Sequence, residues 1–241
     1  MYDRPETAEA NDRLWHLICA ALGDLAPDRL TRDIADLTTH WQSPDLVLSQ
    51  TCGFPYRAIL SDRVHLAASP VLNLDCPTGH YYSVIIAHKS RAGAPLTDFN
   101  FATAAYNEPM SQSGWAALYA HMSGAGLQLG ALMQSGAHRA SAQAVADRQA
   151  DIAAIDALTW QMICKWDDFA SDLCVIEKTA PTPALPYICA RSVSPILIRD
   201  ALRQASRALS EEDKDTLGLL GVTVLPTQAY LDIATPPPPA K

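Results

Sequence analysis

The sequence lacks the features by which nucleic-acid-binding and membrane-embedded proteins are usually known. Its 241 residues hold 18 Lys and Arg against 26 Asp and Glu, a formal net charge of −8. Without a basic stripe to displace phosphate counterions, the chain is not expected to bind nucleic acid or an anionic membrane surface. The longest stretch free of acidic and basic residues, 109–138, is broken by Ser, Gln, Gly and two His. It therefore predicts no membrane-inserted segment.

Cysteine and histidine also lack informative spacing. No pair of cysteines forms a C-x-x-C motif, and the scatter is typical of reduced thiols rather than of a disulfide framework. The six cysteines are Cys19, Cys52, Cys76, Cys164, Cys174 and Cys189. The seven histidines contain no His-Glu-x-x-His or other ligand spacing, so neither a metal nor a cofactor is expected.

The first 13 residues are rich in charge and contain no apolar h-region, so no secretory signal is visible in this chain. Taken alone, this favours either a cytoplasmic protein or an exported one whose leader is missing. A small anion remains a possible ligand despite the negative charge, since backbone N–H groups and hydroxyls bind anions without Lys or Arg.

The sequence does contain a regular alternation of helical and extended patterns. Helices are expected over residues 10–22, 31–41, 113–122, 141–148, 157–166, 194–209 and 211–219. Strands are expected over residues 45–49, 64–72, 81–88, 101–106, 129–134, 151–155, 173–177 and 187–190. This alternation predicts an α/β protein of two lobes, each a mostly parallel sheet flanked by helices. Lobe 1 is expected to comprise 1–85 and 180–241, and lobe 2 to comprise 86–179.

The segment Ser111-Gln-Ser-Gly114 carries the strongest chemical signal. It follows a strand that ends near Asn107 and it opens the next helix. Two hydroxyls and several unpaired backbone N–H groups would converge there, with the positive end of the helix dipole behind them. Gly114 would let an oxyanion approach the backbone closely. The alternative is that Ser111 or Ser113 only caps the helix.

Two further strand ends carry polar side chains. His138, in Gly136-Ala-His-Arg-Ala-Ser141, could donate an N–H to an anion, although a lone loop histidine is more often a surface residue. Ser141 is a plausible helix cap. Asp156 ends the buried strand in Ala150-Asp-Ile-Ala-Ala-Ile-Asp156. It could cap the following helix, accept hydrogen bonds from a ligand, or orient His138.

The three motifs together resemble the phosphonate-type substrate-binding proteins of ABC transporters. Those proteins carry a Ser-Thr-Ser-Gly-like loop, a Gly-Ser-His-like turn and a Val-Asp-Ala-like strand in the same order and at similar spacing. The likeness covers about residues 45 to 195. It implies the two-lobed type II periplasmic-binding-protein fold, in which phosphate, phosphite or a phosphonate is held in the cleft between the lobes.

The resemblance also assigns roles to residues. Ser111, Gln112, Ser113 and His138, with the backbone at Gly114, would hold the phosphoryl oxygens, and Asp156 would meet the distal group of the ligand. Tyr81 matches a family tyrosine at the cleft. First-lobe residues that would face the cleft are Thr51, Cys52, Gly53 and Tyr56.

Two departures from the family pattern concern the site. Gln112 stands where a hydroxyl is common, which replaces a small donor by a longer amide. The apolar first strand of the family's first lobe is also missing, and Met1–Pro5 resembles the loop after such a strand. On that reading Tyr2 could face the ligand.

The resemblance implies a monomeric solute-binding protein that performs no chemistry. It would reside in the periplasm and deliver a small anion to an ABC permease if the chain is exported. One alternative is a cytoplasmic ligand-sensing module of the same fold, favoured by the missing leader and the free thiols. The other is a Cys-dependent hydrolase with Cys52 as nucleophile, His138 as base and Asp156 as its orienting group.

Overall fold

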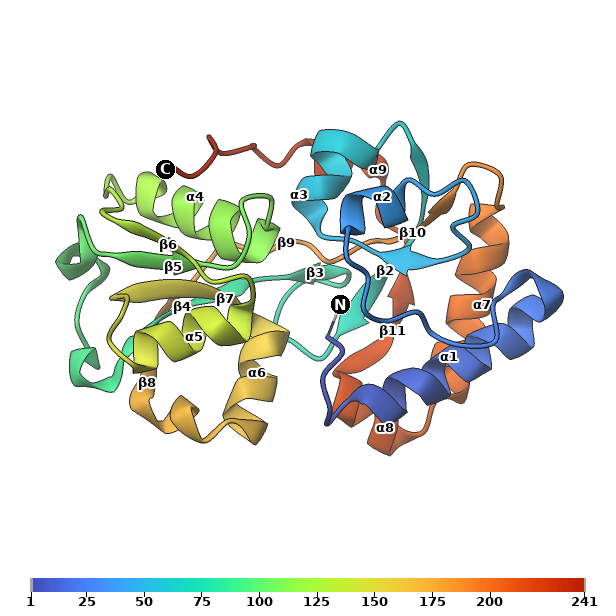
Figure 1. Cartoon of the computed structure of the whole chain (residues 1–241), viewed down its shortest axis with the longest axis horizontal. Helices are drawn as coiled ribbons and strands as arrows, with labels where there is room; N and C mark the ends of the chain where they lie inside the picture. The colour runs from blue at the N-terminus through green and yellow to red at the C-terminus, as the bar shows by residue number, and fades with distance from the viewer. Residues whose placement is uncertain (1, 241) are drawn as a thin grey trace. The chain divides into compact units, whose positions relative to one another are not determined.

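The computed structural model describes residues 2–240, which form two compact units (Figure 1). Unit 1 holds the residues up to His80 together with Pro183–Ile233, and unit 2 holds Tyr81–Thr182 together with the residues from Ala234 onward. The chain therefore passes between the units three times. At the first two passages the short strands β3 (His80–Tyr81) and β9 (Thr182–Pro183) pair with each other.

Unit 1 is built on a four-stranded sheet of order β1-β10-β2-β11, in which each neighbouring pair is antiparallel. Its strands are β1 (Ser49–Gln50), β2 (Val64–Leu72), β10 (Tyr187–Ala190) and β11 (Leu219–Thr223). Its helices and helical turns are α1 (Ala8–Leu22), η1 (Gly23–Leu25), α2 (Leu37–Trp41), α3 (Gly53–Pro55), η2 (Tyr56–Leu60), α7 (Pro195–Ala208), α8 (Glu211–Leu217) and α9 (Thr227–Leu231).

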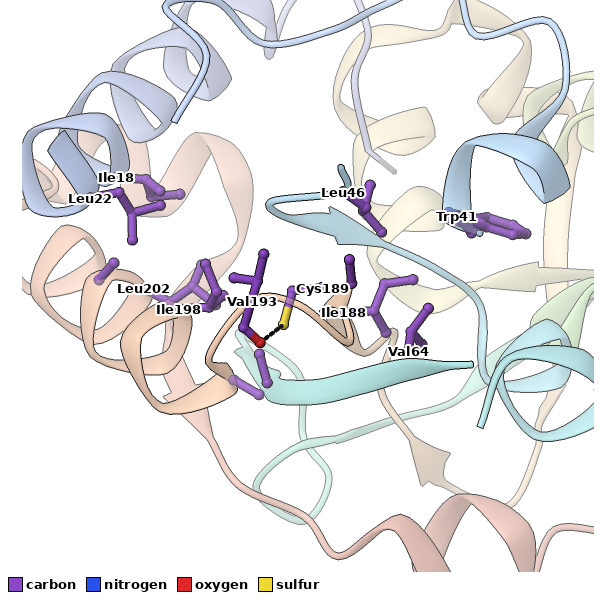
Figure 2. Packing of buried hydrophobic residues seen from close by; sticks show 14 of the residues in the cluster. Ile18, Leu22, Trp41, Leu46, Val64, Ile188, Cys189, Val193, Ile198 and Leu202 are labelled. Atoms are coloured by element: carbon purple, nitrogen blue, oxygen red, sulfur yellow. Dashed lines mark hydrogen bonds between the residues drawn. The ribbon is translucent and has the colours of Figure 1, made fainter. Parts of the chain in front are cut away.

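The core of unit 1 lies between its helices and this sheet (Figure 2). Ile18 and Leu22 repeat at helical spacing on α1 and are buried in the same cluster as Ile198 and Leu202 of α7. Gly23 ends α1 with a φ of 60° and donates its N–H to the carbonyl of Cys19, so the helix expected over 10–22 ends where it was predicted to end.

Unit 2 contains a five-stranded sheet of order β6-β5-β7-β4-β8. Its strands are β4 (Ser83–His88), β5 (Ala104–Tyr106), β6 (Leu132–Gln134), β7 (Ile152–Asp156) and β8 (Leu173–Lys178). Its helices and helical turns are η3 (Lys89–Arg91), η4 (Leu96–Phe99), η5 (Gln112–Ala116), α4 (Ala117–Gly124), α5 (His138–Ala146), α6 (Ala157–Trp166) and η6 (Asp168–Asp172).

Both faces of the unit 2 sheet are covered. On β4, Val84 and Ile86 belong to one buried cluster, with residues of α5 and α6, while Ile85 and Ala87 belong to another, with residues of α4. Because side chains alternate across a strand, these clusters lie on opposite faces. The strand is therefore apolar along its whole length, which is typical of a sheet that helices sandwich.

The prediction of mostly parallel sheets is wrong in detail, since the four-stranded sheet of unit 1 is antiparallel and the five-stranded sheet of unit 2 is mixed. In the five-stranded sheet β5 pairs in parallel with β6 and with β7, and these strands follow one another through intervening helices. The strand β4, which enters unit 2, pairs antiparallel with β7 and β8. In unit 1 the neighbours β2, β10 and β11 come from stretches before and after the excursion through unit 2. No crossover helix joins these neighbours in chain order, so the rule that favours parallel pairing does not apply.

Several predicted elements are confirmed, and others change length. The helix over 157–166 and the strand over 187–190 coincide with α6 and β10. The strand expected over 45–49 is reduced to β1, and the helix over 31–41 is reduced to α2. Ser141 is not a cap, because α5 already begins at His138 and Ser141 is buried inside it.

The described residues contain neither a membrane-spanning helix nor a metal site. No helix within residues 2–240 is long and apolar enough to cross a membrane. The same residues contain no group of His, Cys, Asp and Glu arranged to hold a metal ion. None of the six cysteines, all of which lie within the described residues, forms a disulfide.

Candidate functional site

The serine loop, residues 111–114, lies in unit 2 at the start of η5, a π-helical turn that continues into α4. Ser111 is the N-cap, and its hydroxyl accepts the N–H of Gly114 at 2.9 Å. Its own hydroxyl hydrogen can still donate. Ser111, Gln112 and Ser113 are all buried. Single π-helical turns inside longer helices occur frequently at functional sites.

Only a glycine fits at position 114, because a side chain from the end of the preceding strand lies against it. A Cβ at position 114 would lie 1.9 Å from Oδ1 of Asn107 and 2.9 Å from its Cγ. This close approach explains the glycine. Asn107 also accepts the N–H of Gly136 at its backbone carbonyl, at 3.0 Å, so it contacts both the serine loop and the turn before His138.

The structure brings Ser113 and His138 together. The Ser113 hydroxyl and the His138 Nε2 are 2.8 Å apart, a direct hydrogen bond between two segments 25 residues apart in sequence. His138 is the first residue of α5, so the first turns of two helices meet at this bond. The two motifs that the resemblance assigns to one ligand therefore meet at these two side chains.

The start of α5 is anchored by several polar contacts. The Ser135 hydroxyl lies 2.6 Å from the Ser141 hydroxyl, and the Ser135 N–H donates to the carbonyl of Tyr106 at 2.8 Å. Arg139 donates from Nε to the carboxylate of Asp167 at 2.8 Å. Together these bonds fix the backbone on both sides of His138.

Burial makes His138 a neutral imidazole. The residue is half-buried as a whole, but its Nδ1 is fully enclosed. Loss of hydration lowers the pKa of His138 to about 4, against a smaller opposing effect from the backbone of Ala154. At neutral pH one ring nitrogen carries a hydrogen and the other does not. The cluster therefore offers hydrogen bonds without a formal positive charge from this histidine.

Asp156 lies one strand away from this cluster. It is buried at the end of β7 and caps α6, accepting the N–H of Thr159 at 3.0 Å, so the capping role is confirmed. Opposite it in the sheet is Ser83 of β4. The buried Ser83 hydroxyl donates to the backbone carbonyl of Ser113 at 2.9 Å and so connects the strand pair to the serine loop.

The remaining candidate residues lie outside this cluster. Tyr81 is buried at the beginning of unit 2. In unit 1, Thr51 is fully buried, and its hydroxyl has no hydrogen-bond partner among the described residues. Such a hydroxyl loses its bonds to water without replacement, which costs about 1–3 kcal/mol. An orphaned donor of this kind is available to a ligand or a water molecule.

Tyr56 and Tyr2 have other contacts within unit 1. The buried Tyr56 stacks edge to face on Tyr230, with ring centroids 5.2 Å apart, and its hydroxyl lies 3.4 Å from that of Thr227. Burial raises its pKa. Tyr2 lines a cavity of about 50 Å³ in unit 1, and its carbonyl accepts the hydroxyl of Thr7 at 2.8 Å. Cys52 is buried as the N-cap residue of α3.

Asn107 and Ser83 belong to the candidate site, although no sequence motif pointed to them. For Asn107 a signal exists, because an Asn at a strand end four residues before a serine cap is well placed to contact the loop. Ser83 carries no such signal. Its role depends on the register of β4 against β7, which only the folded sheet determines.

Solved structures similar to this chain share its fold at low sequence identity. PhnD1 from Prochlorococcus marinus, in complex with methylphosphonate, matches with a TM-score of 0.70 and 15% identity, over 93% of this chain and 91% of that one. A protein of Xanthomonas citri bound to chloride gives 0.68 and 13%, over 94% and 90%. The binding protein component of an ABC phosphonate transporter from Pseudomonas aeruginosa gives 0.63 and 16%, over 89% and 76%.

These likenesses confirm the type II periplasmic-binding-protein fold. None of the curated proteins matches the sequence significantly. The family model described as ABC transporter, phosphonate, periplasmic substrate-binding protein matches residues 24–226, which is most of the chain. The chain therefore belongs to the family of periplasmic substrate-binding proteins of phosphonate ABC transporters.

Proposed function

We propose that this protein captures a small phosphorus oxyanion, namely phosphate, phosphite or a phosphonate, and that the serine loop and His138 hold its oxygens. The observation that carries the proposal is the 2.8 Å contact between Ser113 Oγ and His138 Nε2, which joins two separate motifs in one polar cluster. In this proposal the two units are the two lobes, and Thr51, Tyr56, Tyr81 and Tyr2 face the ligand from outside the serine–histidine cluster.

The cluster supplies donors in a suitable state. If Nε2 of the neutral imidazole carries the hydrogen, it donates to Ser113 Oγ, and the Ser113 hydroxyl hydrogen is left to point at an oxyanion. Hydrogen bonds to a charged acceptor contribute about 1.5–3 kcal/mol each. Five or six of them could support binding of about −8 kcal/mol, in the micromolar range, after association and ordering costs. Asp156 would accept a hydrogen bond from the distal group of the ligand.

We further propose that the ligand leaves unchanged and passes to an ABC permease, with the protein acting as a monomer in the periplasm. Closure of the two units on the ligand would create the form that a permease recognises. Phosphorus NMR of methylphosphonate and of phosphate monoesters, incubated with the protein, should retain all starting resonances. Appearance of a new phosphorus resonance would instead favour the hydrolase alternative with Cys52.

Ligand titrations followed by melting temperature test the binding proposal. Phosphate, phosphite and methylphosphonate should be compared with sulfate and chloride at constant ionic strength. A ligand at 100 times its dissociation constant should stabilise the protein by about 2.7 kcal/mol. If no phosphorus oxyanion raises the melting temperature, the proposal is wrong.

Serine substitutions locate the site within the protein. Removing the Ser113 hydroxyl deletes one hydrogen bond to a charged acceptor, so Ser113→Ala should weaken binding by about 10- to 100-fold. Ser123→Ala is the matched control. Ser123 lies on α4, in the helix that continues from the serine loop, and its hydroxyl bonds only locally to the carbonyl of Tyr119 at 2.7 Å. Equal affinity losses in both variants would contradict the assignment.

A further inference from the structure

We propose that unit 2 carries an aromatic seat for a polyproline segment, that the occupant is the chain's own C-terminal segment 234–240, and that this contact holds the serine loop in its binding conformation. The seat is defined here as Trp115 with its neighbours Tyr106 and Tyr119. The segment joins unit 2 although the helix before it, α9, belongs to unit 1.

The seat is built from three rings on three elements, β5, η5 and α4. Trp115 lies 5.5 Å from Tyr106 and 5.5 Å from Tyr119, measured between ring centroids. Only 3% of Trp115 is exposed. Its indole Nε1 donates to the carbonyl of Pro237 at 2.9 Å. Grooves lined by aromatic rings, in which an indole N–H bonds to a backbone carbonyl, suit an extended proline-rich chain.

The segment has the composition and the burial pattern of a polyproline II helix. Pro236–Pro239 fix φ near −65° and push each preceding residue into an extended conformation. Pro236 and Pro239 are partly buried, whereas Pro237 and Pro238 between them are exposed. A polyproline II helix has three residues per turn, so residues 236 and 239 lie on one face. The segment therefore presents a single face to unit 2, as a docked ligand would.

The contact acts on the proposed binding site because Trp115 follows the serine loop directly. It lies inside η5, one residue after Gly114, and Ser111 accepts the N–H of Ala116 at its carbonyl. A seat that fixes Trp115 therefore also restrains the backbone that positions Ser111 and Ser113. This last step rests on the proposed function, whereas the docking of the segment does not.

Fluorescence of the ligand-free protein tests the docking itself. A stop after Ile233 removes the segment and should expose the Trp115 indole, which moves its emission to longer wavelength. The Trp115 contribution is obtained by subtracting the spectrum of Trp115→Phe, in the full-length and in the truncated background. Trp160→Phe, which changes a partly buried tryptophan of α6 in the same unit, is the control and should leave the shift unchanged.

A second variant keeps the length of the segment but removes its stiffness. Replacement of Pro236–Pro239 by Gly-Ser-Gly-Ser retains backbone carbonyls for the indole and gives a flexible chain that must be ordered to bind. This variant should shift the Trp115 emission in the same direction as the truncation. If Trp115 emits identically in the full-length, truncated and Gly-Ser proteins, the seat is not occupied by this segment and the proposal is overturned.

Two further measurements complete the test. Sedimentation should give a monomer for the full-length protein, whereas a dimer that becomes monomeric on truncation would place the segment on the seat of a second copy and contradict the intramolecular form.

Loss of the contact should weaken binding of methylphosphonate by about 2- to 10-fold, the effect of one neutral hydrogen bond. An emission shift with unchanged affinity would overturn the coupling to the serine loop. An emission shift in a protein that binds no phosphorus oxyanion would refute the proposed function and leave the docking intact.

Discussion

At the scale of the residue, burial changes the protonation of His138. Its folded-state pKa is lowered to about 4 by burial, while an exposed histidine titrates near 6.5. Between these values the unfolded chain binds a proton that the folded chain excludes. The contribution of His138 to stability is therefore complete above pH 6.5 and is lost as the pH falls toward 4.

We expect this loss to be measurable in urea unfolding at pH 7.5 and pH 5. It should amount to about 1–2 kcal/mol, allowing for the solvent that reaches a half-buried side chain. His138→Gln cannot titrate and keeps a side-chain amide at the position, so the variant should lose correspondingly less stability over the same interval. Equal pH dependence in both proteins would show that His138 is not protonated preferentially in the unfolded chain.

The contact between Gly114 and Asn107 makes a second prediction at this scale. In Gly114→Ala the new methyl group would overlap Asn107 Oδ1, and overpacking of this kind costs about 1–3 kcal/mol. Asn107→Ala removes the obstructing atoms. The double variant should therefore be more stable than the sum of the two single effects indicates, as measured in a double-mutant cycle. Strict additivity would mean that the two residues do not contact each other.

Much of the candidate cluster could be predicted from the sequence because its parts are local. Each motif lies at a strand end before a helix, and capping hydroxyls such as Ser111 depend on a few neighbouring residues. The contact of Ser113 with His138 follows from the parallel order of β5 and β6, whose carboxyl ends lie together. Ser83 could not be predicted, since it reaches Ser113 only through the pairing of a strand from another part of the chain.

At the scale of the element, α8 illustrates how one buried charge joins two helices. Asp213, with 6% of its side chain exposed, accepts a hydrogen bond from Nε of Arg13 on α1 that its two oxygens share, and another from Nη2. It also lies in the first turn of α8, where Ser210 caps its N–H. The hydrogen bond from Arg13 lowers the pKa of Asp213.

Removing this carboxylate should loosen α8 from α1. Asp213→Asn should cost about 1–2 kcal/mol in urea unfolding, because a charge-assisted bidentate contact becomes a neutral one. Glu211→Gln on the same helix is the control. Its ion pair with Lys214 is solvent-exposed and should contribute less than about 0.5 kcal/mol. Similar losses of unfolding free energy in both variants would show that Asp213 contributes no more to stability than an exposed charge does.

The sequence predicts the bounds of a helix or strand best where its apolar pattern is continuous and its side chains are buried. The buried strand β7 and the helix α6 that follows it have clear apolar patterns and were predicted almost to the residue. The strand expected at 45–49 was not, because its apolar run Leu46-Val-Leu48 packs against the core of unit 1 without strand pairing before Ser49. An apolar run indicates that a segment is buried, but a buried segment need not pair with a neighbouring strand.

At the scale of the whole molecule, the division into two units has a consequence for folding. Residues 81–182 form a continuous stretch with their own sheet and buried clusters on both of its faces. We expect this stretch, expressed alone, to unfold cooperatively in urea and to give dispersed amide resonances in NMR. It should be less stable than unit 2 in the intact protein, because it lacks the segment whose Pro237 carbonyl accepts the hydrogen bond from Trp115. A fragment without a cooperative transition would show that unit 2 depends on unit 1 to fold.

The bond between Trp115 and Pro237 bears on how the protein is handled in the laboratory. A purification tag or a fluorescent reporter fused directly after the proline segment would follow closely on the Pro237 carbonyl that accepts the hydrogen bond from the Trp115 indole. A bulky or charged fusion there would compete with docking of the prolines on the aromatic seat. It would then change the apparent affinity for the ligand although no residue of the binding site is altered. A dye attached to the proline segment would lie close to Trp115, which quenches many fluorophores. Its fluorescence would therefore report release of the segment from the seat.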